Sequence, residues 1–366
     1  MPPEENYTNH SSLLQNPRPE IYNTASIFGK GGSGLSTKAV ALISGGLDSV
    51  LAAKVIMEQG FDVIGLYYTS AFSKSFGNEK DTHAASVAKA IGIDLRITDM
   101  GQNYIDLVRN PAHGYGKNVN PCIDCKIYML KQAKAVMKEV NAPFVVTGEV
   151  LGQRPMSQRR DTFHVIERDA DMRGLIVRPL SATLLPPTKA EQEGLIQREK
   201  LLGISGRSRT IQLRLAERFG IRGYSTPAGG CLLTDKNFAE KLRDLFEDKL
   251  AANPMDIRLL TVGRHFRIDA GRKIVLGRDN KENKVLMELA PHGYHLFTPD
   301  SFPGPVALLS GETSQEIRQT IGRLIITYSK QVPGRSYLIR HGNEIFDPGE
   351  PLPINASNLR RVGADG

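Results

Sequence analysis

The stretch KAVALISGGLDS, residues 38–49, decides the fold class of this chain. Its first half is an unbroken run of apolar and β-branched residues, which is typical of a buried parallel strand. A glycine-rich turn follows, and then a helical stretch from about 49 to 59, which Gly60 is suited to end. The sequence therefore predicts a strand, a tight loop and a helix in direct succession.

The turn itself, Ser44-Gly45-Gly46-Leu47-Asp48-Ser49, has the chemistry of a phosphate-binding loop. Glycines let backbone amides approach phosphate oxygens, and the helix N-terminus adds positive potential. Asp48 stands where the Walker pattern has its lysine, so this is a different loop, and an acidic side chain there suits a contact bridged by Mg²⁺. An ordinary strand-to-helix turn is the alternative, and the full string in this context argues against it.

Strand-like and helix-like segments continue to alternate beyond the loop. Strands are expected at 61–68, 94–98 and 144–147, and helices at 84–91 and 126–140. This alternation predicts an open, doubly wound, mostly parallel α/β sheet. A closing helix at 237–250 and the Asn253-Pro254 step then indicate a linker.

Four regions follow from this pattern. We expect a flexible N-terminal tail at 1–37, with a short docking segment near Ile27-Phe28, and the α/β domain at 38–250. Short strands between glycine turns predict a smaller α+β domain at 255–341. The segment 342–366 is rich in Pro, Gly and Asn and is expected to be loose.

The loop string resembles the PP-loop of the ATP pyrophosphatase superfamily, whose fold is that of adenine nucleotide alpha hydrolases. The resemblance implies that residues 44–49 bind the pyrophosphate part of ATP with Mg²⁺, and that AMP is transferred to a substrate oxygen. Such activation suits the replacement of a uracil carbonyl oxygen by sulfur, because adenylated oxygen leaves as AMP.

A second string narrows this resemblance. Thr147-Gly148-Glu149-Val150-Leu151-Gly152-Gln153, with Ser157-Gln158 and Arg178-Pro179-Leu180 after it, is similar to the 4-thiouridine synthase branch of tRNA sulfurtransferases. The resemblance implies that Gly148 and Gln158 lie along the nucleotide and that Lys131 is a basic contact, with a solvated helix face as the alternative for Lys131. The sequence departs from that branch before the PP-loop, where a large RNA-binding region is absent, and in having no rhodanese-like domain.

The chain has three cysteines, Cys122, Cys125 and Cys231. A small, odd number does not indicate a disulfide framework, which implies a reducing compartment. The pair at 122 and 125 is expected just before the helix that begins at 126. A zinc site would need a fourth ligand such as His113 or His83, and a redox pair would leave Cys231 without a role. We favour a 4Fe–4S cluster, an arrangement seen among related tRNA thiolases, with one iron open for sulfide.

The C-terminal run around Val262-Gly263-Arg264-His265-Phe266-Arg267 resembles the RNA-binding domain of NFACT ribosome-quality-control proteins. Basic side chains there are expected to contact phosphates, and aromatic side chains to stack on bases. The expected phosphate contacts are Arg264, His265, Arg267, Lys273 and Arg278, and the expected stacking residues are Phe266 and Tyr294. An idle basic surface is the alternative.

The formal charge of +8 favours polyanionic partners, nucleic acid above all, although it also serves solubility. The 366 residues contain no apolar stretch long enough to span a membrane. The leading hypothesis is a cytoplasmic tRNA uridine thiolase that uses ATP, Mg²⁺ and a sulfur donor, either sulfide or a cysteine desulfurase, with a homodimer as one assembly it allows. The alternatives are a PP-loop ligase acting on a small molecule and a nucleotide-switched RNA- or ribosome-binding factor.

Overall fold

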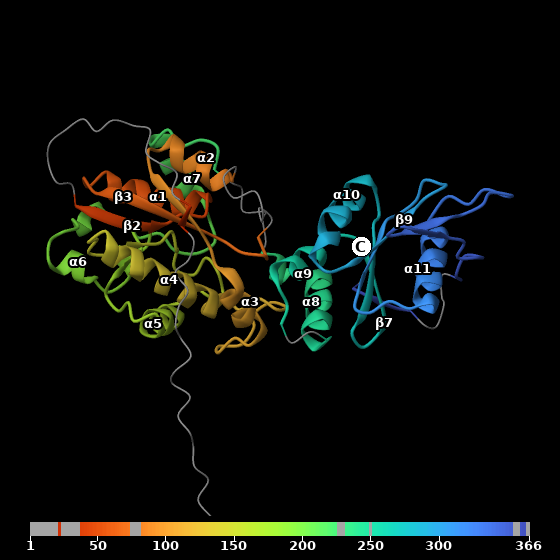
Figure 1. Ribbon diagram of the computed structural model, residues 1–366. Helices are drawn as coiled ribbons and strands as arrows, with labels where there is room; N and C mark the ends of the chain where they lie inside the picture. Colours follow the sequence, from red (N-terminus) through yellow and green to blue (C-terminus); the bar gives the residue numbers. More distant parts are fainter. Residues whose placement is uncertain are drawn as a thin grey trace, which may run out of the picture.

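The computed structural model describes residues 21–22, 37–73, 82–224, 231–248, 251–353 and 359–363. Figure 1 shows two sheet-containing parts side by side, one built by the first half of the chain and one by the last third. Helices α8 (Lys236–Asp248) and α9 (Pro254–Leu259) lie between them.

The first sheet has six strands in the order β1-β4-β3-β2-β5-β6. Every neighbouring pair is parallel except β1 and β4, which run antiparallel. The sheet confirms the predicted mostly parallel α/β fold. Its strands are β1 Ile21–Tyr22, β2 Lys38–Leu42, β3 Asp62–Thr69, β4 Asp94–Asp99, β5 Val145–Val146 and β6 Ile176–Val177.

Helices cover both faces of this sheet. Ala39 and Ala41 of β2 pack into the core under one set of helices, and Val40 packs into the core on the opposite face. Because both faces are buried, β2 reads as a continuous apolar run and not as an alternating one. On the first face lie α1 (Leu47–Met57), α2 (His83–Ala90) and α7 (Thr210–Arg218); on the second lie α4 (Cys122–Glu139) and α5 (Arg160–Asp169). Two further helices are α3 (Gly101–Arg109) and the short α6 (Lys189–Gln192).

Two expectations for this half need correction. Helix α4 begins at Cys122 and not at 126, because the Cys125 amide already donates to the Pro121 carbonyl at 2.8 Å. The cysteine pair therefore forms the first turn of the helix. The segment 1–37 is also not entirely a free tail, since β1 pairs with β4; the expected docking segment Ile27-Phe28 lies outside the described residues.

The second sheet is antiparallel and has seven strands in the order β12-β11-β9-β10-β8-β7-β13. Helix α11 (Gln315–Thr327) packs on one face, while α9 and α10 (Asn280–Leu289) pack on the other. This is the predicted smaller α+β domain. Its strands are β7 Arg264–Asp269, β8 Arg272–Leu276, β9 His295–Pro299, β10 Ala307–Ser310, β11 Ile339–His341, β12 Glu344–Phe346 and β13 Arg360–Val362.

The expectation of a loose tail at 342–366 is wrong for two parts of it. Strand β12 closes a hairpin with β11, and β13 pairs antiparallel with β7. The side chain of Val362 is buried against the sheet, which gives this short segment an apolar anchor beside its backbone pairing. Proline and glycine content alone did not reveal these two edge strands.

The predicted linker at Asn253-Pro254 is a packed junction. The Asn253 side chain caps α9 by accepting hydrogen bonds from the amides of Met255 and Asp256, at 2.8 and 3.0 Å. Ala252, Ile257 and Leu260 are buried in one core with residues of α3 and α8. The C-terminal sheet is therefore attached through a shared core and not through a free tether.

Candidate active site

The loop 44–49 joins the carboxyl end of β2 to the N-terminus of α1. Gly45 has a φ of +74°, and a Cβ on it would lie 2.9 Å from the Ala84 backbone, so only glycine fits there. The two serines brace the turn: Ser49 Oγ donates to the Gly46 carbonyl at 2.8 Å and accepts from the Ser44 amide at 3.2 Å. The loop keeps its backbone amides at the helix N-terminus, which is the geometry of an anion site.

The second motif packs directly on this loop. Strands β2 and β5 are neighbours, so the segments that follow them meet at the same edge of the sheet, where the strand order reverses. Gly148 follows β5, and a Cβ on it would lie 2.5 Å from the Cα of Ser49. A glycine is required here because the two backbones touch.

Glu149, the next residue, is the centre of a buried ion network. Its side chain is 3% exposed and pairs with Lys126 Nζ at 2.9 Å and Arg178 Nε at 3.0 Å. Burial alone would raise the pKa of Glu149, but the Lys126 ammonium and the Arg178 guanidinium lower it to about 2. Arg178 also donates to Glu167 at 2.5 Å and lies over the Phe163 ring. The network joins the second motif to the first turns of α4.

Among the other predicted residues, Asp48 and Gln158 lie in buried or nearly buried positions with unfilled acceptors. Asp48 forms an ion pair with Arg209, Oδ2 to Nη2 at 3.5 Å. Its Oδ1 atom and the Oε1 atom of buried Gln158 have no hydrogen-bond partner within the described ranges. Each of these side chains therefore has an oxygen atom that could accept a hydrogen bond from a ligand.

Lys131, the predicted basic contact, and Lys126 have different surroundings on α4. Lys131 is exposed on the helix, whereas Lys126 reaches Glu149. Lys126 directly follows the cysteine pair, and sequence reasoning passed over it because four lysines share this helix. Helical spacing from the buried residues Ile127 and Leu130 does not single it out either, since its partner is far along the chain.

The structure brings the three cysteines into one neighbourhood. Burial raises the pKa of Cys125 to about 11, and the nearby thiols of Cys231 and Cys122 add to the increase. Tyr104 donates its hydroxyl hydrogen to Cys125 Sγ at 3.0 Å, and all three cysteines are free. Within the part of the chain that is described, no three His, Cys, Asp or Glu side chains stand in a geometry that could hold a metal ion.

The histidines suggested as a fourth zinc ligand lie elsewhere or are engaged. His113 Nδ1 lies 2.9 Å from Asp124 Oδ1, and its Nε2 lies 2.9 Å from Asp169 Oδ2. The hydrogen bond to Asp124 is the main reason that the pKa of His113 is raised. His83 is exposed at the start of α2. His113 therefore orients Asp124, between the two helical cysteines, with both of its ring nitrogens occupied.

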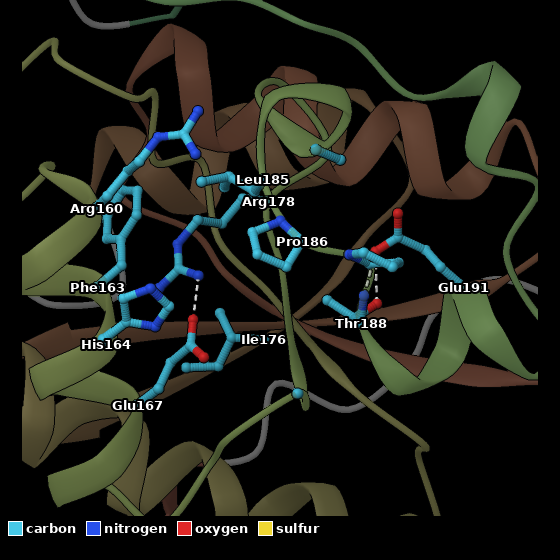
Figure 2. Close-up of a pocket in the computed structure, with 13 residues that line it drawn as sticks. Arg160, Phe163, His164, Glu167, Ile176, Arg178, Leu185, Pro186, Thr188 and Glu191 are labelled. Atoms are coloured by element: carbon cyan, nitrogen blue, oxygen red, sulfur yellow. Dashed lines mark hydrogen bonds and ion pairs between the residues drawn. The ribbon is translucent and has the colours of Figure 1, made fainter.

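A pocket of about 210 Å³ lies beside the edge strand β6 and is lined in part by Ile176 and Arg178. Figure 2 shows Arg178 at its centre, bonded to Glu167 and next to Phe163, with Pro186 and Thr188 on the opposite wall. Arg160 closes the rim by donating to the Leu184 carbonyl at 2.7 Å. Arg178 and Glu167 of the Glu149 network thus line this pocket.

Most of the predicted RNA contacts on the C-terminal domain are not on its surface. His265, Arg267 and Lys273 are buried beneath α8, where Arg267 Nη2 and Lys273 Nζ bind Asp244 Oδ2 at 2.7 and 3.0 Å. Phe266 is buried in the core on the other face, which excludes stacking. The alternation of β7 is real, but α8 covers its polar face.

The remaining predicted contacts have intramolecular partners. Arg264 lies over the Tyr328 ring, Arg278 pairs with Glu282, and the Tyr294 hydroxyl donates to Asp256 at 2.7 Å. An open hollow of about 300 Å³ lies instead on β9 and β11. It is lined by Tyr294, His295, Leu296, Thr298, Arg340, His341 and Gly342. Arg340, which lines this hollow, is an exposed basic group that the sequence analysis did not select, and it pairs with Asp300 at 2.5 Å.

Comparison with protein families matches two separate segments of the chain. Residues 34–183 match the family described as Thiamine biosynthesis protein (ThiI), and residues 263–345 match the family described as NFACT protein RNA binding domain. Both resemblances drawn from the motifs are thus confirmed, for the PP-loop segment and for the C-terminal segment. Among the described helices none has the length and apolarity to cross a membrane.

Two curated relatives illustrate the match. The chain is 30% identical over 153 residues to a probable tRNA sulfurtransferase of Thermococcus kodakarensis, covering 40% of this chain and 38% of that protein. It is 22% identical over 290 residues to the tRNA-specific 2-thiouridylase MnmA of Listeria monocytogenes, covering 71% of this chain and 74% of that one. The chain therefore spans less than half the length of the first relative and about three quarters of the second.

Solved structures give weaker similarity. A 4-thiouridine synthetase bound to RNA and ATP aligns with a TM-score of 0.31 and 20% identity, over 50% of each chain. A predicted subunit of a tRNA methyltransferase from Methanocaldococcus jannaschii aligns with a TM-score of 0.32 and 13% identity, over 50% of this chain and 76% of that one.

Proposed function

We propose that the protein is an ATP-dependent tRNA sulfurtransferase that adenylates a uridine carbonyl oxygen and then replaces that oxygen by sulfur. One observation carries the proposal. Gly148 rests on the phosphate loop, and its neighbour Glu149 is paired with Lys126, the residue after Cys125. The phosphate loop and the first turn of α4, which carries Cys122 and Cys125, are therefore joined by a direct chain of contacts.

The chemistry divides into two displacements. In the first, the uracil carbonyl oxygen attacks the α-phosphorus of ATP. The bond between the α-phosphorus and the oxygen that bridges it to the β-phosphate breaks, and pyrophosphate leaves. In the second, a sulfide sulfur attacks the ring carbon, the carbon–oxygen bond breaks, and AMP leaves. The loop 44–49 at the N-terminus of α1 would hold the phosphates, and Asp48 would orient the Mg²⁺ that accompanies them.

Two measurements test this proposal. Mass spectrometry of tRNA nucleosides from cells lacking the protein should show the loss of one thionucleoside, and an unchanged profile would refute it. In vitro, the wild-type protein should form AMP and pyrophosphate only when tRNA is present. The Asp48→Ala variant should form neither, with its melting temperature preserved. Turnover of ATP without RNA would favour the small-molecule ligase, and formation of ADP would exclude adenylation.

A 4Fe–4S cluster on the cysteines is part of the same proposal. The donor set suits a cluster, since three free thiols lie in one neighbourhood. In the described residues these thiols are not arranged as a metal-binding group. Cys122, Cys125 and Cys231 would hold the cluster, which would supply an open iron for sulfide. Anaerobically purified protein should contain about four irons per chain, and Cys231→Ala should lose iron and thiolation but keep ATP binding. Zinc in place of iron, or an iron-free protein of full activity, would overturn it.

RNA binding by the C-terminal domain is proposed on the open hollow beside Arg340. Arg267 of β7 and Lys273 of β8 are buried, whereas the Arg340 side chain is 47% exposed, so a phosphate in solvent can compete with Asp300 for it. Arg340→Glu should weaken tRNA binding and lessen its salt dependence, because phosphate contacts release counterions. Arg323→Glu, on α11 of the opposite face, is the control. Equal tRNA affinity for both variants and the wild type would place the RNA contact elsewhere.

A further inference from the structure

Arg209 is a cation held at the phosphate loop by a segment that neither family match includes. The matches end at 183 and resume at 263, so Arg209 lies between them. Its guanidinium pairs with Asp48 at 3.5 Å, and the two side chains are 25% and 13% exposed. The loop itself carries no lysine or arginine, although a polyphosphate ligand brings several negative charges to it.

The segment that carries Arg209 is braced against the second motif. The Gly206 amide donates to the Leu151 carbonyl at 2.8 Å, and Ser181 Oγ accepts from the Leu151 amide at 3.0 Å and donates to the Ile204 carbonyl at 2.6 Å. Immediately afterwards α7 begins and packs against α1. Arg209 is thus presented by an ordered support and not by a free loop.

A buried side chain close to Arg209 in the sequence lacks a hydrogen-bond partner in the described part of the chain. Gln212 lies in the first turn of α7, three positions after Arg209, which is the N-cap residue of that helix. It is fully buried, yet neither its Oε1 nor its Nε2 has a hydrogen-bond partner among the described residues. A buried amide left unpaired costs about 1–3 kcal/mol, so such a group indicates a ligand or an ordered water beside the helix.

We propose that Arg209 is a phosphate-binding residue of the nucleotide site, which leaves Asp48 when Mg·ATP binds and contacts the β- and γ-phosphates. This rests on the proposed function. The Asp48 carboxylate would bind the magnesium ion that accompanies ATP, and the guanidinium of Arg209 would then be free to contact phosphate oxygens, which its planar fork matches. Gln212 supplies a neutral hydrogen bond behind it. Arg209 therefore provides the positive charge that a Walker lysine provides in other loops.

Binding of two nucleotides separates this role from a structural one. The full-length protein is titrated calorimetrically with Mg²⁺ and α,β-methylene-ATP, and separately with AMP, which lacks the β- and γ-phosphates. Arg209→Gln should weaken binding of the triphosphate about 10- to 100-fold, the value of a lost charged hydrogen bond, and change AMP binding less than about 3-fold. Arg207→Gln, an exposed arginine two positions earlier, is the matched control and should bind both as the wild type does.

Each result decides the matter. Equal weakening of both nucleotides, or of neither, by Arg209→Gln would overturn the role of Arg209 while leaving the ATP site intact. A wild-type protein that binds neither nucleotide would instead overturn the proposed function. Should Arg209→Gln fail to fold, Arg209→Lys keeps the charge but loses the fork. It should then show a selective loss of triphosphate affinity of about 3- to 10-fold, and wild-type affinity would refute the proposal.

Discussion

Two buried carboxylates, one in each half of the molecule, are surrounded by cations in the same manner. Glu149 is held by Lys126 and Arg178, and Asp244 by Arg267 and Lys273, with all four side-chain distances between 2.7 and 3.0 Å. Their surroundings differ. Glu149 stands beside the phosphate loop, whereas Asp244 lies on α8 under the C-terminal sheet.

The difference between the two networks is one of balance and of place. Arg178 has a second carboxylate, Glu167, so acids and bases near Glu149 are matched. Arg267 likewise has a second carboxylate, Asp248, at 2.9 Å. Asp244 also receives Arg360, at 2.9 Å, so three cations face two carboxylates in this network. The first network positions groups around the proposed chemistry, while the second fastens one sheet to the junction helices.

The largest effect should follow the loss of Asp244. Asp244→Asn leaves Lys273, whose side chain is 7% exposed, without its anion, and leaves Arg267 with Asp248 alone. Breaking a buried pair in this way costs about 3–5 kcal/mol. Urea unfolding of the full-length chain measures this, with exposed Glu247→Gln on the same helix as the control. ATP binding should be retained. A loss below about 1 kcal/mol would show that the cations find water or other acceptors.

Glu149→Gln should be the next largest change. It removes the anion from Lys126 and Arg178, but Lys126 is 22% exposed and can reach water, and Arg178 keeps Glu167. We therefore expect a loss of about 3 kcal/mol, at the low end for a broken buried pair. Unlike Asp244→Asn, it should also abolish AMP formation, because the support of the second motif is disturbed. Glu139→Gln, which breaks the surface ion pair of Glu139 with Arg96, is the control. Full activity in the Glu149 variant would contradict the positioning role.

These two networks also show where sequence reasoning succeeds and where it stops. The loop at 44–49 could be predicted because glycine, serine and helix-start signals are local. Arg209 could not, because its contact with Asp48 joins distant segments. On β7 the alternation of His265 and Arg267 with Phe266 was visible, but a charged strand face normally faces water. Only the fold reveals that α8 covers it with a carboxylate.

Lowering the pH should weaken the Glu149 network by protonating its carboxylate, with a smaller effect than substitution. The folded state holds the pKa of Glu149 at about 2, against 4.5 for the free side chain. A depressed carboxyl pKa contributes stability that is present above pH 4.5 and lost as the pH falls toward 2. The difference in unfolding free energy between wild type and Glu149→Gln should therefore shrink across this interval. A difference independent of pH would mean that the carboxylate charge is not what stabilises the site.

The smallest effect should come from Arg360→Ala. Arg360 binds Asp244 from β13, but its side chain is 68% exposed, so water screens the pair and competes for the guanidinium. Exposed ion pairs contribute about 0–1 kcal/mol, and the backbone pairing of β13 with β7 does not need this side chain. In a double-mutant cycle with Asp244→Asn, the coupling energy from urea unfolding should stay below about 1 kcal/mol. A coupling above about 2 kcal/mol would exceed that range for exposed pairs and show that β13 is held by its charge, and that all three cations of Asp244 act as one buried unit.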